Sequence, residues 1–235
     1  ALVVDDQHHG LSVMATKEDV SSISVLEEYT MDEVGGEVKL KVQSRYYGSE
    51  AETMRSYFNR NSMREIQKNY LNFYARDYSE IEFAKPVAFE DDKTANLFTS
   101  TEEYVVKNFW TIEEETGHTA SLYARVMSSY LAKPETRIRT MPLHVEHPKN
   151  ILHTIKVYLP EEWTVDNYHE EVESDAFTYR SAKFHHDKVL TLRHEYRTKA
   201  PFVKAEASAV HVRNVEKALD DLGFMIYREL PGTSQ

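Results

Sequence analysis

Residues 22–42 read SISVLEEYTMDEVGGEVKLKV, and this stretch decides the fold class of the chain. Apolar side chains occupy every second position on both sides of the Gly35-Gly36 pair: Ile23, Val25 and, less cleanly, Tyr29 before it, and Val38, Leu40 and Val42 after it. Alternation with a period of two is typical of a half-buried strand, and a Gly-Gly pair favours a tight reversal. The stretch therefore predicts a β-hairpin.

Two consecutive helices are predicted directly after the hairpin, over about residues 50–59 and 63–77. Each begins with a Ser-x-x-Glu sequence, Ser49 to Glu52 and Ser62 to Glu65. In such a capping box the serine side chain accepts a hydrogen bond from the third residue's amide, and the glutamate reaches back. Apolar residues then follow at helical spacing: Met54, Tyr57 and Phe58 in the first helix, and Ile66, Tyr70, Phe73 and Tyr74 in the second.

Extended patterns dominate most of the remaining chain. They lie at residues 81–83, 96–110, 137–147, 152–159, 176–183, 188–198 and 224–227. A third capping box at residues 111–114, with later apolar residues, predicts another helix that ends near 132, before Pro134. A final helix is expected over about 206–222, with Gly223 as its left-handed terminus.

Strands thus outnumber helices, and the helices are inserted between strand pairs instead of alternating with single strands. This order excludes a doubly wound parallel sheet. We expect a mainly β (α+β) chain, an antiparallel β-sandwich-like domain with a few inserted helices.

Charge and composition exclude several classes of partner and chemistry. The 235 residues include 39 acidic and 28 basic side chains, for a net charge of −11, which disfavours nucleic acid as a partner. No apolar run reaches the roughly 18 residues that span a bilayer, so no membrane insertion is expected. The chain has no cysteine, which excludes disulfides, thiolate metal sites and a cysteine nucleophile within it.

No catalytic, cofactor-binding or metal-binding residue is predicted. Histidines gather at residues 8–9, 144–153 and 185–186, but adjacent histidines in a strand point to opposite faces and none has metal-ligand spacing. We expect these histidines at the surface or in turns. Glutamate runs at residues 113–115, 161–162 and 170–173 are typical of solvated faces, and no glycine-rich phosphate loop or Gly-x-Ser-x-Gly sequence occurs.

Aromatic side chains give the weak candidates for a binding site. The chain has 15 tyrosines, and Tyr46, Tyr47, Tyr104 and Trp110 are the residues that could line a glycan or peptide groove. Burial of the same rings in a strand-built core is the alternative.

Several segments give the chain a family resemblance. They are ALVVD with Gly10-Leu11, then RYYGSEAETMR (45–55), YLNFYARDY (70–78), EDDKTAN (90–96), TEEYVVKNFW (101–110), RTMPL (139–143) and HTIKVYLPEEW (153–163). Together they resemble the β-rich C-terminal region, a domain of unknown function, of bacterial transglutaminase-like proteins. Those proteins carry a Cys-His-Asp core for acyl transfer or peptide hydrolysis, but no triad position falls in this chain.

The resemblance implies a division of the chain and a role for it. Residues 1–18 correspond to the exit strand of an upstream transglutaminase-like core, and residues 19–235 to one accessory domain, with a subdivision near residue 112 left open. The expected partners are that core, within the same polypeptide, and a protein or glycan substrate, in the periplasm or at the cell surface. The chain alone is then not an enzyme, whereas its parent is an acyltransferase or a cysteine protease. The alternative is a stand-alone hydrolase, or a glycan- or peptide-binding module, with its own histidine and carboxylate site.

Overall fold

A computed structural model describes residues 22–113, 117–134 and 139–229, so the expected exit strand over 1–18 lies outside the described residues. Its largest element is an eight-stranded sheet with the order β3-β4-β2-β1-β8-β11-β10-β9. Its strands, in chain order, are β1 (Ser22–Met31), β2 (Val38–Tyr47), β3 (Ile81–Asp92), β4 (Leu97–Val106), β8 (Asn150–Tyr158), β9 (Tyr168–Glu173), β10 (Phe177–His186) and β11 (Val189–Thr198).

Neighbouring strands of this sheet run antiparallel, except at its centre. There β1 and β8 pair in parallel, from Ser22 opposite Asn150 to Thr30 opposite Tyr158. This pairing joins strands from both sides of residue 112 into one sheet, although a subdivision at that point stays a prediction. The mainly β, α+β fold expected from the sequence is confirmed, and the sheet is mixed.

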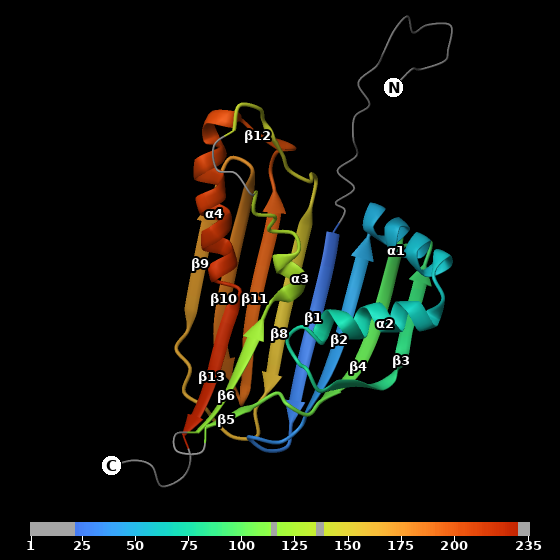
Figure 1. Cartoon of the computed structure of the whole chain (residues 1–235), viewed down its shortest axis with the longest axis vertical. Coiled ribbons are helices and arrows are strands. Elements are labelled where there is room, and N and C mark those ends of the chain that lie inside the picture. The colour runs from blue at the N-terminus through green and yellow to red at the C-terminus, as the bar shows by residue number, and fades with distance from the viewer. Residues whose placement is uncertain (1–21, 114–116, 135–138, 230–235) are drawn as a thin grey trace, which may run out of the picture.

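A second layer covers one face of the large sheet (Figure 1). Its helices are α1 (Ser49–Arg60), α2 (Met63–Tyr74), α3 (Arg125–Ser128) and α4 (Ser208–Asp220), the last preceded by a 3₁₀ turn, η1 (Ala205–Ala207). The layer also contains a three-stranded sheet of β5 (Thr111–Glu113), β6 (Gly117–Tyr123) and β13 (Gly223–Glu229). A separate two-stranded sheet consists of β7 (Leu143–His144) and β12 (Phe202–Val203). None of the helices in the described ranges is long and apolar enough to cross a membrane.

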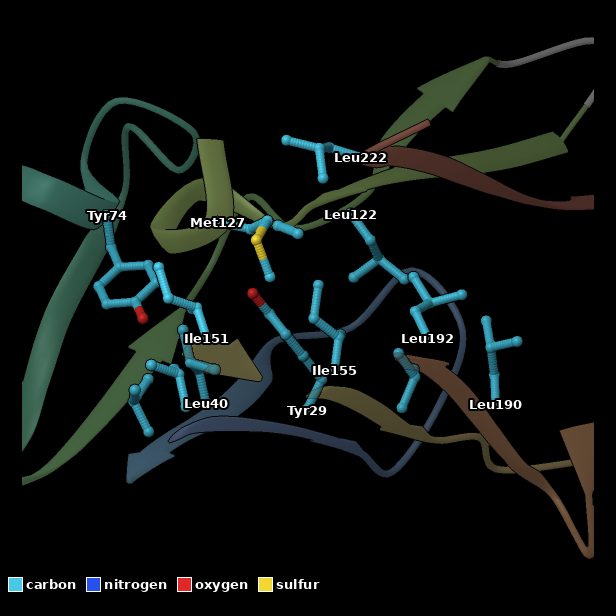
Figure 2. Packing of buried hydrophobic residues seen from close by; sticks show 14 of the residues in the cluster. Tyr29, Leu40, Tyr74, Leu122, Met127, Ile151, Ile155, Leu190, Leu192 and Leu222 are labelled. Carbon is cyan, nitrogen blue, oxygen red and sulfur yellow. The ribbon is translucent and has the colours of Figure 1, made fainter. Parts of the chain in front are cut away.

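The main hydrophobic core lies between the two layers. Figure 2 shows Tyr29, Ile151 and Ile155 of the large sheet below Met127 and Leu122 of the second layer. A smaller cluster lies under α1 and α2, where the tilted rings of Phe58 and Phe98 have their centres 4.9 Å apart, with Ala51, Ile66 and Val87 in the same cluster. The two helices therefore cover β2, β3 and β4, while the small sheet and α4 cover the other half.

The hairpin and the first two helices form where their local patterns predict them. The helix expected over 111–132 is wrong, because residues 111–113 and 117–123 form β5 and β6, and in the described part of this segment only residues 125–128 are helical. Gly223 begins β13 and does not end α4 in a left-handed conformation. Helix α1 is capped by Gly48 with φ 62° and has no side-chain cap, so the Ser49 capping box is wrong as well.

At Ser62 the serine half of the capping box forms, since the Ser62 hydroxyl accepts a hydrogen bond from the Glu65 amide at 3.2 Å. Substituting Ser62→Ala removes the acceptor, and we expect it to lower the free energy of unfolding by about 1 kcal/mol. Ser62→Asp keeps a hydrogen-bond acceptor and should lower the free energy of unfolding by far less. Urea denaturation of the three proteins measures the difference, and equal midpoints for Ser62→Ala and the wild type would contradict the capping role.

Candidate functional site

Three ionisable side chains interrupt the apolar face of the large sheet at its centre. They are Glu27 in β1, Glu102 in β4 and His153 in β8. Each side chain points to the buried face of its strand and is at most 2% exposed. Glu27 lies opposite Val42, and Val42 lies opposite Glu102 on the next strand. The two carboxylates therefore lie in one row across the sheet, with their Cα atoms about 10 Å apart from the strand spacing.

Glu27 is the acceptor of a buried hydrogen-bond network. Its Oε2 accepts from the Tyr29 hydroxyl and its Oε1 from the Tyr74 hydroxyl, each at 3.0 Å. Tyr78 donates in turn to the Tyr29 oxygen at 3.1 Å. Burial, and after it the Glu27 charge, raises the pKa of Tyr29 and of Tyr74 well above the ordinary value, so both hydroxyls stay protonated donors.

His153 is the third donor to Glu27, and its backbone partner fixes the tautomer. The amide of Met127, in α3, donates to Nδ1 at 3.4 Å, so Nδ1 carries no hydrogen. Nε2 therefore holds the hydrogen and donates to Glu27 Oε1 at 3.0 Å. His153 is fully buried, so its expected place at the surface or in a turn is wrong.

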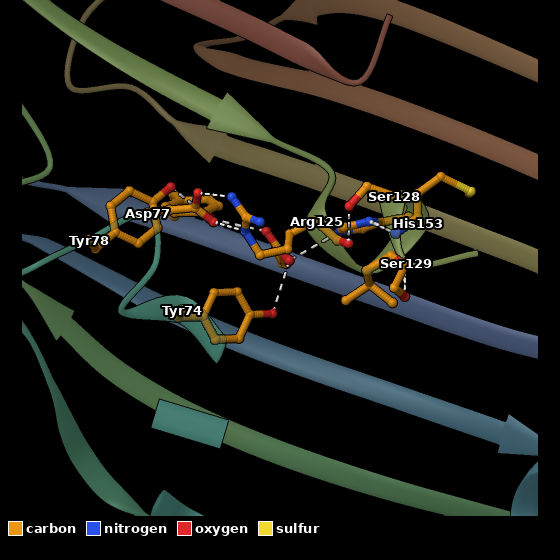
Figure 3. A network of polar contacts seen from close by, with 11 residues as sticks. Tyr74, Asp77, Tyr78, Arg125, Ser128, Ser129 and His153 are labelled. Atoms are coloured by element: carbon orange, nitrogen blue, oxygen red, sulfur yellow. Dashed lines mark hydrogen bonds and ion pairs between the residues drawn. The ribbon is translucent and has the colours of Figure 1, made fainter. Parts of the chain in front are cut away.

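An ion pair fixes α3 against the end of α2 above this network. Arg125 donates through Nε and Nη2 to the two carboxylate oxygens of Asp77, three residues after α2, as Figure 3 shows. The Arg125 guanidinium also lies 5.2 Å from the ring centre of Tyr123. Fork-to-fork pairs of this kind constrain orientation as well as distance. The two helices are thereby held at a set separation over the sheet.

Glu102 has a different environment from Glu27. One hydroxyl, that of Tyr104, donates to its Oε2, at 2.6 Å. Burial raises the pKa of Glu102 to about 7, the Tyr104 hydrogen bond opposes the rise, and the Glu27 charge adds to it. Glu102 therefore changes charge near neutral pH, a property that clusters at functional sites.

A cavity of about 430 Å³ lies beside Glu102, between the sheet and helices α1, α2 and α3. Five tyrosines contribute to its lining: Tyr46, Tyr57, Tyr70, Tyr74 and Tyr130. Asn69 Nδ2 donates to the Tyr57 hydroxyl at 3.0 Å and ties the two helices together at the lining. The result is an aromatic pocket that holds one carboxyl group of variable charge.

The structure brings together two of the four aromatic residues named from the sequence. Tyr46 lines the cavity, and Tyr104 is buried behind it with its hydroxyl on Glu102. Tyr47 belongs to the opposite face of β2 by strand alternation. Trp110 lies in the main core, 6.2 Å from the ring of Trp163, and does not line the cavity.

The histidines and carboxylates of residues 161–162 and 185–187 do not line this cavity. His185 Nε2 lies 3.9 Å from Glu162, and His186 pairs with its neighbour Asp187, both 84% exposed. Within the described ranges, no three His, Asp or Glu side chains gather closely enough to hold a metal ion.

Sequence reasoning missed Glu27, Glu102 and the buried role of His153. A signal was present, because each takes a buried position in a strand whose alternate residues are mostly apolar, as in Ile23, Val25, Glu27, Tyr29 and Met31. A charged residue at a buried strand position requires a hydrogen-bonding or oppositely charged partner. One partner of Glu27, Tyr29, is two residues away, but His153 lies 126 positions further along the chain and is brought close only by the pairing of β1 with β8.

Comparison of the chain with models of known protein families, with curated proteins and with solved structures finds no match.

Proposed function

We propose that this chain is a non-catalytic accessory domain of a transglutaminase-like protein, and that its tyrosine cavity binds a cationic side chain of a peptide substrate. The family resemblance supports the accessory role, as does the lack of a cysteine that could serve as a thiol nucleophile. The single observation that carries the binding role is the cavity beside Glu102.

Tyrosine rings and a carboxylate are the groups that attract an organic cation. A ring face carries partial negative charge, and cation–π attraction reaches about 2 kcal/mol where water is excluded. Glu102, when ionised, adds a full negative charge beside the five tyrosines of the cavity. A lysine side chain, with an apolar stem and a charged tip, is complementary to both.

The charge of Glu102 makes this binding depend on pH. With a pKa of about 7, the ionised fraction of Glu102 rises from about one tenth at pH 6 to about nine tenths at pH 8. Lysine stays protonated throughout this range. The affinity for a lysine peptide should therefore rise roughly tenfold from pH 6 to pH 8.

Isothermal titration calorimetry with the peptide acetyl-Gly-Lys-Gly-amide at the two pH values tests this prediction. Glu102→Gln keeps an acceptor for Tyr104 but no charge, so its affinity should be lower at pH 8 and independent of pH. Glu103→Gln is the matched control, because Glu103 lies on the opposite face of β4 and pairs with Lys85 at 2.8 Å. Equal binding of the same peptide with acetylated lysine would exclude recognition of the cation.

The accessory role has its own test in the coding sequence upstream of Ala1. An open reading frame that encodes a Cys, then a His, then an Asp in a transglutaminase-like arrangement would support it. A start codon directly before Ala1 would overturn the accessory role and leave the cavity as the site of a free-standing binding module.

A further inference from the structure

A second cavity, of about 220 Å³, lies at the other end of the large sheet, beyond the C-terminal end of α4. Its lining includes Tyr168, Ser181, Lys183, His194, Asp220, Asp221 and Phe224. Ser181 and His194 lie directly opposite each other on β10 and β11, so their side chains share the covered face of the sheet. The volume far exceeds the roughly 30 Å³ that one water molecule occupies.

A short hydrogen-bond chain fixes the tautomer of His194. The Tyr179 hydroxyl donates to Asp221 Oδ2 at 2.8 Å and lies 2.8 Å from His194 Nδ1. The single hydroxyl hydrogen is used on the carboxylate, so Nδ1 carries a hydrogen and donates to the tyrosine oxygen. His194 Nε2 is then an acceptor.

That acceptor has no hydrogen-bonding partner among the residues that the structure describes. His194 is 4% exposed, and leaving a buried polar atom unpaired costs about 1–3 kcal/mol. Burial also lowers the pKa of His194 to about 3, so the ring is neutral at physiological pH. The unpaired Nε2 therefore marks a place where a hydrogen-bond donor from outside the chain would be stabilised.

The charges around the cavity select a neutral donor. The Lys183 ammonium lies 4.3 Å from the ring centre of Phe224 and 5.2 Å from that of Tyr168, and it would repel a cation. Asp220 and Asp221, which also line the cavity, would repel an anion. A hydroxyl group avoids both penalties, since it can donate to His194 or a carboxylate and accept from Lys183 or Ser181.

We infer that this cavity is a second binding site, for a neutral polyhydroxylated molecule such as one sugar ring of a glycan, with a ligand hydroxyl donating to His194 Nε2. This cavity and the peptide cavity are separate, since they share no lining residue. Adjacent sugar hydroxyls match the mixed acceptors and donors of the lining, and the ring occupies the volume.

Nuclear magnetic resonance of the whole chain with free D-glucose, D-galactose and N-acetylglucosamine tests the inference. At least one sugar should give saturation-transfer signals and shift the ¹⁵N resonance of His194 Nε2, as a new hydrogen bond requires. His194→Phe removes the acceptor and should weaken binding roughly tenfold, the effect of losing one buried hydrogen bond. Ser181→Ala serves if His194→Phe does not fold, and it should also weaken binding.

Two controls separate this site from the rest of the molecule. Lys156→Met, on the uncovered face of β8, and Glu102→Gln, in the first cavity, should leave sugar binding unchanged. Loss of sugar binding in Glu102→Gln would overturn the assignment to the second cavity. An Nε2 resonance that no sugar moves, with no saturation transfer, would show that the cavity holds water only and overturn the inference.

Discussion

Replacing Glu27 by alanine is expected to lower the free energy of unfolding by about 3–5 kcal/mol, the largest effect of any single substitution considered for this chain. The substitution removes the shared acceptor of Tyr29, Tyr74 and His153, at 3.0 Å from each. All three donors are buried, so water does not replace the lost acceptor and each keeps its desolvation cost. A domain has only about 5–15 kcal/mol of stability to lose.

Glu28→Ala is the matched control for this substitution. Glu28 is the next residue in β1, points to the opposite face and accepts one hydrogen bond, from Tyr158 at 2.8 Å. Glu28→Ala should lower the free energy of unfolding by less than about 1 kcal/mol. Urea denaturation gives both values, provided the dependence on urea concentration is unchanged. Similar costs for the two substitutions would contradict the central role of Glu27.

The second large effect is a pH dependence of stability that originates in Glu102. A carboxyl whose pKa is about 7 in the folded state, against an ordinary value of 4.5, binds its proton more tightly when folded. Its contribution to stability is therefore fully present below pH 4.5 and is lost as the pH rises through 7. At about 1.4 kcal/mol for each pKa unit, the wild type loses about 3 kcal/mol from this group between pH 4 and pH 8.

Glu102→Gln should remove this part of the pH dependence. The neutral amide still accepts from Tyr104, so the variant is expected to be more stable than the wild type at pH 8 and similar to it at pH 5. Denaturation midpoints at pH 5, 6, 7 and 8, compared with those of Glu103→Gln, measure the difference. Parallel pH profiles for Glu102→Gln and the wild type would show that Glu102 has an ordinary pKa.

The elements that could be predicted from the sequence are those whose stabilising contacts are local. The β1–β2 hairpin pairs residues on either side of one turn, from Met31 opposite Val38 to Ser22 opposite Tyr47. Helix α2 combines an apolar stripe with a cap four residues long. Periodicity and turn chemistry carry this information because the interacting residues are near neighbours in the chain.

The helix expected over 111–132 shows where local patterns fail. Residues 111–113 and 117–123 form β5 and β6 because β6 pairs with β13, about 100 residues further along the chain. At Gly117, φ is 154° and a Cβ would lie 2.2 Å from the carbonyl oxygen of Arg228, so this close approach needs glycine. The capping motif at residues 111–114 gives no information about β13, whose pairing with β6 favours a strand over a helix.

The sequence by itself determined the fold class, the hairpin and the first two helices, and it placed Tyr46 and Tyr104 among the candidate binding residues. Only the tertiary structure decided that β1 pairs in parallel with β8, which brings His153 to Glu27 across 126 residues. The same packing places three helices over Glu102 and leaves His194 Nε2 unpaired beside a cavity. Periodicity records which face of a strand is buried, whereas the partner of a buried charge depends on which strands become neighbours, and that is settled by the packing of the whole sheet.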